Sequence, residues 1–119
     1  MTRRMSCSLT TEAVRNRQKT VTRRHVDTWT TLEPGDRLTL IEKGMGLPKG
    51  AKQVILAEVE VVAVDVEYIL DVTLEEVARE GCSPMSPQEF ILMWLKSHGH
   101  RGADVAEVQC RRIEWKYIA

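Results

Sequence analysis

The sequence predicts an α+β fold, in which a small, partly open β-barrel has α-helices packed on its side. Residues 54–70 and 105–118 alternate apolar and polar side chains as strands do, but the phase of the alternation shifts within each segment. Such a shift inside a long strand indicates a β-bulge or a bend, and small barrels turn their corners in this way. Two capping boxes predict helices, so strands and helices are expected to share one core.

The chain of 119 residues has the size of one domain, and we expect residues 1–119 to fold as a single unit without disulfides or metal. Apolar residues make up 43% of it and charged residues 29%, as in ordinary globular proteins. No apolar run is long enough to cross a bilayer, and no apolar segment follows Arg3 and Arg4 as in a secretory signal. We therefore expect a cytoplasmic protein with no membrane partner.

The N-terminal part predicts a short strand and a short helix. Residues 5–9 alternate like a strand, and Thr10 or Thr11 can cap a helix that ends near residue 17. Ala13 and Val14 would face the core. In the basic stretch of residues 19–24, Val21 is the only apolar side chain. We expect Val21 to anchor this stretch and its polar side chains to be free.

The middle of the chain reads as strand, loop and strand. Residues 33–36 have the composition of a turn, and residues 37–42 form a strand with Leu38 and Leu40 on one face. Residues 43–52 are rich in glycine and lysine, so they form either a loop close to a ligand or an ordinary long hairpin loop. In residues 54–70 the alternation changes from odd to even positions after Val61.

Both capping boxes open helices. Residues 73–76 begin a helix that should end near Gly81, and residues 86–89 begin one that should end at Gly99. Phe90 and Trp94 belong to an apolar stripe on the second helix, which indicates core packing. The last strand is expected within residues 105–118.

Charge is unevenly distributed although the net charge is zero. Residues 1–24 hold seven basic residues and one acid, whereas residues 53–90 hold nine acids and one base. This asymmetry favours a basic face for a polyanion and an acidic face opposite to it, unless the two segments interleave in space.

Glu80 violates a local rule. It lies at the C-terminal end of its predicted helix, where the helix dipole disfavours a negative charge by about 0.3–1 kcal/mol. Glu76 lies one turn earlier and adds repulsion. A residue without local compensation indicates either a distant cationic partner or a functional role, and both hold if the cation is Lys19.

Cysteines and histidines give no metal or disulfide pattern. Cys7, Cys82 and Cys110 are widely separated and form no C-x-x-C pair. His98 and His100 flank Gly99 and are expected to be solvated loop residues. We expect no metal and no cofactor.

Residues 10–24 resemble the opening of the ASCH domain, a branch of the PUA-like superfamily with the motif G-x-K-x-x-T-x-R. Lys19, Thr22 and Arg24 occupy the K, T and R of that motif, and Arg17 stands where glycine is usual. Residues 32–36, 77–81 and 113–115 are similar to later features of the family in the same order. Residues 42–47 are similar to small ASCH-like proteins of actinobacterial phages and their hosts.

The resemblance implies a PUA-like barrel with a basic cleft for RNA or modified nucleobases. Some members of the family are amidohydrolases that deacetylate N4-acetylcytidine, with a lysine, a threonine and a glutamate as catalytic residues. Carried over, these roles fall on Lys19, Thr22 and Glu80. A threonine hydroxyl needs a neighbouring base to become nucleophilic. Because side chains three positions apart point to opposite faces of a strand, a turn or bulge between Lys19 and Thr22 is required.

The sequence and the resemblance together suggest three alternative functions. The first is a module that binds RNA, DNA or a modified nucleoside, with an aromatic such as Trp29 for stacking, although Trp29 also suits the core. Its candidate binding residues are Lys19, Thr22, Arg23, Arg24, Lys43 and Lys49. The second is the amidohydrolase. The third is an effector that binds a host protein through the acidic residues 53–90. The sequence leaves open the oligomeric state and the choice between RNA and DNA.

Overall fold

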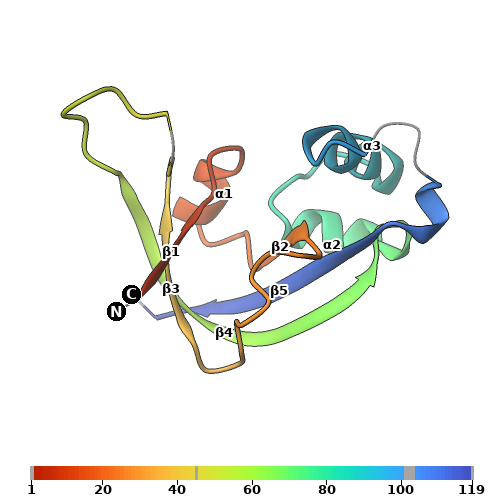
Figure 1. Ribbon diagram of the computed structural model, residues 1–119, viewed down its shortest axis with the longest axis horizontal. Helices are drawn as coiled ribbons and strands as arrows, with labels where there is room; N and C mark the ends of the chain where they lie inside the picture. Colours follow the sequence, from red (N-terminus) through yellow and green to blue (C-terminus); the bar gives the residue numbers. More distant parts are fainter. Residues whose placement is uncertain (1, 45, 101–103, 119) are drawn as a thin grey trace.

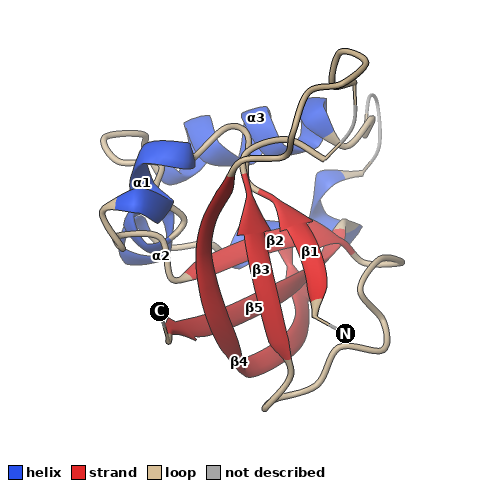
Figure 2. Ribbon diagram, turned by 90° about the vertical axis from the view of Figure 1, so that its left-hand side faces the viewer, coloured by secondary structure: helices blue, strands red, loops and turns tan. Residues whose placement is uncertain are grey.

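The computed structural model of the protein describes residues 2–44, 46–100 and 104–118 and has an α+β architecture. One five-stranded mixed sheet in the order β1-β3-β4-β5-β2 curls into a half-barrel, and the helices lie toward one end of it (Figures 1 and 2). The strands are β1 (Arg3–Ser6), β2 (Val21–His25), β3 (Arg37–Ile41), β4 (Ile55–Tyr68) and β5 (Gln109–Tyr117). The helices are α1 (Thr11–Arg15), α2 (Leu74–Arg79) and α3 (Pro87–Ser97), with 3-10 turns η1 (Ile69–Asp71) and η2 (Val105–Glu107). The predicted fold class is confirmed.

The long strands β4 and β5 form the backbone of the half-barrel (Figure 1). β4 pairs antiparallel with β3 along its first half and with β5 from Val59 onward. The register of β4 and β5 shifts between Val61 and Ala63, where the apolar alternation changes phase. The predicted bulge in this strand is therefore confirmed, and it lets one strand serve both walls of the curved sheet.

The barrel is open because its two edge strands do not pair with each other. β1 pairs in parallel with β3, and β2 pairs antiparallel with β5 at the other edge. One core cluster, which includes Met5, Leu40 and Trp115, packs with the curved sheet. A second cluster, which includes Val77 and Trp94, lies with α2 and α3.

The helix ends follow the sequence signals closely. The side chain of Thr73 accepts a hydrogen bond from the Glu76 amide, and Ser86 and Glu89 form a complete capping box. α1 is shorter than predicted, and the Thr10 side chain does not cap it. None of the described helices combines the length and the apolar character that a membrane crossing requires.

The expectation that the polar side chains of residues 19–24 are free is wrong. Val21 is buried as predicted, but Lys19, Thr22 and Arg23 are buried too. β2 pairs with β5 along its whole length, and Trp94 of α3 donates a hydrogen bond from Nε1 to the carbonyl oxygen of Arg23 at 2.9 Å. The helix thus covers β2, and the strand becomes an interior element despite its charge.

Candidate functional site

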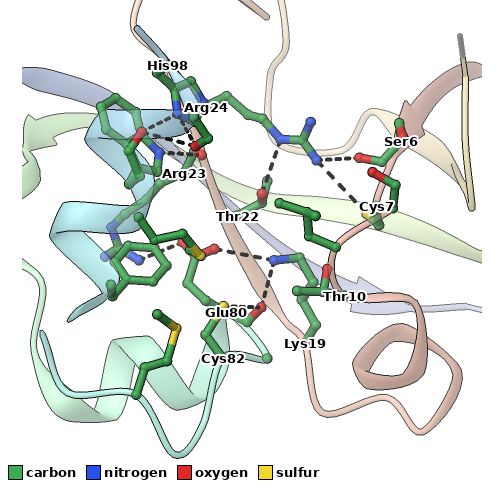
Figure 3. Close-up of a pocket in the computed structure, with 18 residues that line it drawn as sticks. Ser6, Cys7, Thr10, Lys19, Thr22, Arg23, Arg24, Glu80, Cys82 and His98 are labelled. Carbon is green, nitrogen blue, oxygen red and sulfur yellow. Dashed lines mark hydrogen bonds and ion pairs between the residues drawn. The ribbon is translucent and has the colours of Figure 1, made fainter. Parts of the chain in front are cut away.

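A pocket of about 430 Å³ lies where residues 6–10, β2, the end of α2 and α3 meet (Figure 3). This volume is in the usual range of small-molecule sites. Most of its wall is apolar or aromatic, and it includes Leu9, Met85, Phe90, Met93 and Trp94. Its polar lining includes Lys19, Thr22, Arg24, Glu80 and His98. An apolar cavity with a few polar groups on its wall is the usual form of a binding site for a small organic ligand.

Lys19 and Glu80 form a buried ion pair on the wall of the pocket (Figure 3). The Nζ atom of Lys19 lies 3.3 Å from Oε1 of Glu80 and donates a hydrogen bond to the Glu80 carbonyl oxygen at 2.7 Å. The two side chains are 4% and 5% exposed. The charge of Glu80 is therefore balanced by Lys19, a cation distant in the sequence, because its own helix end supplies no balancing charge.

Gly81 allows the end of α2 to approach Lys19. Its φ of +83° lies in the left-handed region, and an added Cβ would come within 2.5 Å of the Ala13 Cβ and 3.4 Å of the Lys19 Cβ. The Thr20 amide also donates to the carbonyl oxygen of Arg79 at 2.8 Å. Only glycine fits both the backbone conformation and the close approach, so Gly81 sets the distance across which Lys19 and Glu80 meet.

Arg23 binds three carboxylates rather than facing solvent. Its Nη1 lies 3.0 Å from Glu80 Oε2, its Nη2 lies 2.7 Å from Glu76 Oε1, and its Nε donates to Glu67 Oε1 at 2.8 Å. The side chain is 1% exposed. Burial alone would lower the pKa of the Arg23 guanidinium, but the carboxylates outweigh burial and raise it. Arg23 is therefore placed to orient Glu80, and its guanidinium is not accessible to a phosphate.

Glu76 connects Arg23 to a wider network of ion pairs. Arg112 donates to its carboxylate from Nε at 2.6 Å, and Arg79 lies 3.2 Å from the other oxygen. Burial would raise the pKa of Glu76, but hydrogen bonds from Arg112 and Arg23 lower it to about 2. The prediction that the Glu76 side chain completes a capping box is wrong, because its carboxylate is hydrogen-bonded to these arginines instead.

The basic and acidic segments interleave at this network, so the prediction of two separate charged faces fails there. Glu67, Glu76 and Glu80 all belong to the acidic segment, yet all three contact Arg23 of the basic one. These three carboxylates are therefore paired with an arginine rather than forming a separate acidic face.

Thr22 and Arg24 lie at the opening between the two edge strands. Arg24 donates from Nε to Thr22 Oγ1 at 3.1 Å and from Nη2 to the Ser6 carbonyl oxygen at 2.7 Å (Figure 3). Arg24 thus reaches from β2 toward the end of β1. Because Thr22 Oγ1 accepts this bond, its own hydrogen remains available to a partner in the pocket.

Lys19, Thr22 and Glu80 line the same pocket. Lys19 precedes β2, which begins at Val21, so the strand alternation does not force it onto the face opposite Thr22. No hydrogen bond joins Lys19 and Thr22 among the described residues, because Nζ is directed to Glu80.

The remaining candidates from the sequence lie elsewhere. Lys43 and Lys49 are exposed in the loop between β3 and β4 and do not line the pocket. Trp29 packs against the barrel core, with the Arg3 guanidinium 4.4 Å from its ring centre. Trp29 is therefore mainly a core residue.

Sequence reasoning missed the aromatic wall of the pocket. Trp94 was expected only in the core and His98 only in solvent, but both line the cavity and their rings stack with centres 4.0 Å apart. Their i, i+4 spacing on α3 was the signal that could have linked them, because such residues share a helix face.

The sulfur atoms of Cys7 and Cys82 also reach the pocket lining. Burial raises the pKa of both thiols, which makes them poor nucleophiles near neutral pH. Within the described residues, no group of three histidine, cysteine or acidic side chains could hold a metal ion.

No family model matches the sequence, and no curated protein matches it either. Solved structures do match. Hypothetical protein PH0355 has a TM-score of 0.64 at 18% identity, over 99% of this chain and 100% of that chain. Protein EF3133 from Enterococcus faecalis V583, of the family DUF984, has a TM-score of 0.65 at 11% identity, over 93% of this chain and 71% of that chain. The ASCH domain from Lactobacillus crispatus JV V101 has a TM-score of 0.59 at 12% identity, over 92% of this chain and 70% of that chain.

These similarities cover at least 92% of this chain, so they extend over both the half-barrel and its helices. Identities of this size establish a common fold rather than a common activity. The chain has the fold of the ASCH domain, a PUA-like half-barrel with flanking helices.

Proposed function

We propose that this protein, as a single ASCH-like domain, binds one nucleobase or nucleoside in the pocket, either free or as part of an RNA or DNA strand. The observation that carries the proposal is a buried polar cluster, Lys19, Thr22 and Glu80, in a cavity that also has an apolar and aromatic wall. A base is planar and apolar on its faces and polar on its edge. It therefore suits a cavity whose aromatic wall can cover a ring and whose few polar groups can read an edge.

Contacts to the nucleic-acid backbone are assigned to cations outside the buried network. Lys43 and Lys49 are exposed and can meet phosphates beyond the pocket. Arg24 has neutral partners, the Ser6 carbonyl and the Thr22 hydroxyl, so its charge is available at the pocket. Arg23 acts indirectly, because it orients Glu80.

Equilibrium dialysis with nucleosides and with short single-stranded RNA and DNA tests this proposal. We expect Lys19→Met to abolish nucleoside binding, while Lys96→Met, at an exposed position on α3, leaves it unchanged. Strand binding should weaken as salt rises, because lysine–phosphate contacts release counterions. Equal affinity in Lys19→Met, or strand affinity that is flat between low and moderate salt, would argue against the proposal.

A second candidate is an amidohydrolase acting on an N4-acetylcytidine-type nucleoside, because Lys19, Thr22 and Glu80 share one pocket. With the proton of the pair on Glu80 and Lys19 neutral, Thr22 Oγ1 would attack the acyl carbonyl, Lys19 would take the hydroxyl proton, and Glu80 would protonate the leaving amine. Water would then hydrolyse the acyl-threonine, which releases acetate and restores the hydroxyl. We rank it second because Lys19 is hydrogen-bonded to Glu80 rather than to Thr22. Lys19 would have to turn toward Thr22 before it could act as the base.

Incubation with N4-acetylcytidine, followed by chromatography for cytidine and acetate, tests this candidate. Turnover by the wild type that disappears in both Lys19→Ala and Thr22→Val would support it. No turnover, or turnover that persists in Lys19→Ala, would remove the catalytic role and leave the binding role standing.

A further inference from the structure

His98 has a fixed position on the wall of the pocket. It follows α3 directly, and its ring stacks on Trp94 with centres 4.0 Å apart and planes inclined by 20°. Trp94 is in turn fixed by its hydrogen bond to the carbonyl oxygen of Arg23. Both rings line the cavity, and His98 lies near Arg24 (Figure 3). The imidazole is therefore held by packing rather than free in a solvated loop.

The hydrogen bonds of the ring define its tautomer. Nδ1 lies 2.8 Å from the carbonyl oxygen of Trp94, and a carbonyl oxygen can only accept. Nδ1 must therefore carry the hydrogen, which leaves Nε2 of the neutral ring as an acceptor. The Ser97 hydroxyl, 3.1 Å from Nδ1, also lies on the Nδ1 side. Within the described residues, Nε2 has no hydrogen-bond partner.

The surroundings of His98 favour the neutral ring. Burial lowers its pKa, and the charge of Arg24 on β2 acts in the same direction. The other titratable groups that face it, His25 on β2 and His100 beyond α3, also oppose a positive charge when protonated. The hydrogen bond to Trp94 acts the other way and is outweighed. The ring is thus neutral at physiological pH, and its acceptor nitrogen is retained.

We propose that His98 determines the specificity of the pocket, because its Nε2 atom accepts a hydrogen bond from an N–H group of the bound base. This inference rests on the proposed function and narrows it to bases that present an exocyclic amine to Nε2. At neutral pH the pocket prefers an exocyclic amine to the carbonyl that replaces it in the matched base. When the ring is protonated, Nε2 becomes a donor and this preference is lost or reversed.

Two pairs of nucleosides test the inference, because each pair exchanges an amine for a carbonyl: cytidine with uridine, and adenosine with inosine. Their affinities are measured by equilibrium dialysis from about pH 7.5 to about pH 5, which spans the range in which histidine titrates. For wild-type protein we expect roughly tenfold tighter binding of the amine member at the upper end, because a carbonyl would leave Nε2 unpaired. As the pH is lowered, the preference for the amine member should disappear only at a pH lower than that at which a free histidine titrates.

The key variant is His98→Phe, which keeps a planar ring on Trp94 but removes both nitrogens. It should bind the members of each pair equally at every pH, whereas the control His25→Phe should retain the preference and its pH dependence. Long-range proton–nitrogen NMR of the wild type provides a second measurement, independent of any variant. It should show hydrogen on Nδ1 and a shifted Nε2 resonance when the amine nucleoside binds.

The possible outcomes distinguish a failure of the His98 role from a failure of nucleoside binding by the pocket. An unchanged preference in His98→Phe, a preference for the carbonyl member at neutral pH, or hydrogen on Nε2 would overturn the role of His98 alone. Binding of all four nucleosides without discrimination would do the same. If none of them binds to the wild type, the proposed function fails and the inference fails with it.

Discussion

Lys19 and Glu80 depend on each other unequally, and this asymmetry gives a sharp prediction for stability. The Glu80 carboxylate has two cationic partners, Lys19 Nζ at 3.3 Å and Arg23 Nη1 at 3.0 Å. Lys19 has one carboxylate partner among the described residues, and its other bond goes to the Glu80 carbonyl oxygen. Removal of Glu80 therefore leaves a buried ammonium with no carboxylate, whereas removal of Lys19 leaves Glu80 still paired.

The magnitudes follow from this difference. Removing one partner of a buried ion pair costs about 3–5 kcal/mol when it leaves the other charge uncompensated, so we expect Glu80→Gln to cost about 3 kcal/mol. Lys19→Met preserves the Arg23 contact and much of the buried volume, and we expect a loss of about 1–2 kcal/mol. The double variant should be no less stable than Glu80→Gln alone, because no unpaired ammonium remains.

Urea unfolding followed by tryptophan fluorescence measures these changes, since the sequence contains three tryptophans. Lys96→Met, on the exposed face of α3, is the matched control and should change the free energy of unfolding by less than about 0.5 kcal/mol. If Lys19→Met destabilises the protein as much as Glu80→Gln does, the two side chains do not depend on each other unequally. Strictly additive losses in the double variant would also refute the prediction, because they would mean that the two side chains do not interact.

Variants at three further positions test other parts of the structure. Gly81→Ala should cost at least about 2 kcal/mol in urea unfolding, because it combines left-handed backbone strain with a 2.5 Å approach to Ala13. The pKa of Glu76, lowered from 4.5 to about 2, contributes about 3 kcal/mol to the free energy of unfolding. This contribution is complete above pH 4.5 and is lost as the pH falls toward 2. Stability measured against pH should lack this acid loss in Glu76→Gln, and a profile equal to that of the wild type would contradict the prediction. Arg17, at φ +64°, should tolerate Gly within about 1 kcal/mol, because relief of strain offsets the lost contact with Tyr117; thermal melts should show Arg17→Ala to be the less stable of the two.

Local signals predicted most of the fold. The phase change after Val61 located the bulge in β4, and the capping boxes located α2 and α3 to within a residue at their starts. Both signals act over a few residues, so the sequence contains them directly. The order of the strands and the opening between β1 and β2 depend on contacts between distant segments, so the sequence did not predict them; the resemblance to a known family implied only a barrel with flanking helices.

The site was only half predictable for the same reason. Glu80 stood out because its own helix end disfavours its charge, and Lys19 was the cation suggested for it. The burial of Arg23 could not be foreseen, because it depends on α3 covering β2 and on Glu67 and Glu76 arriving from two other elements. Alternation along a strand says which side chains share a face, but not whether that face will be covered.

The charge balance of the network explains why the basic motif contains cations with different roles. Four cations and four carboxylates interact within it: Lys19, Arg23, Arg79 and Arg112 with Glu67, Glu76, Glu80 and Glu114. Because these charges cancel, the network can be buried and can hold Glu80 in place without attracting an anion. Arg24 contacts only neutral oxygens and a thiol among the described residues, so its charge is not cancelled. Arg24 therefore brings a cation without a carboxylate partner to the pocket, while Arg23, its neighbour in sequence, orients Glu80.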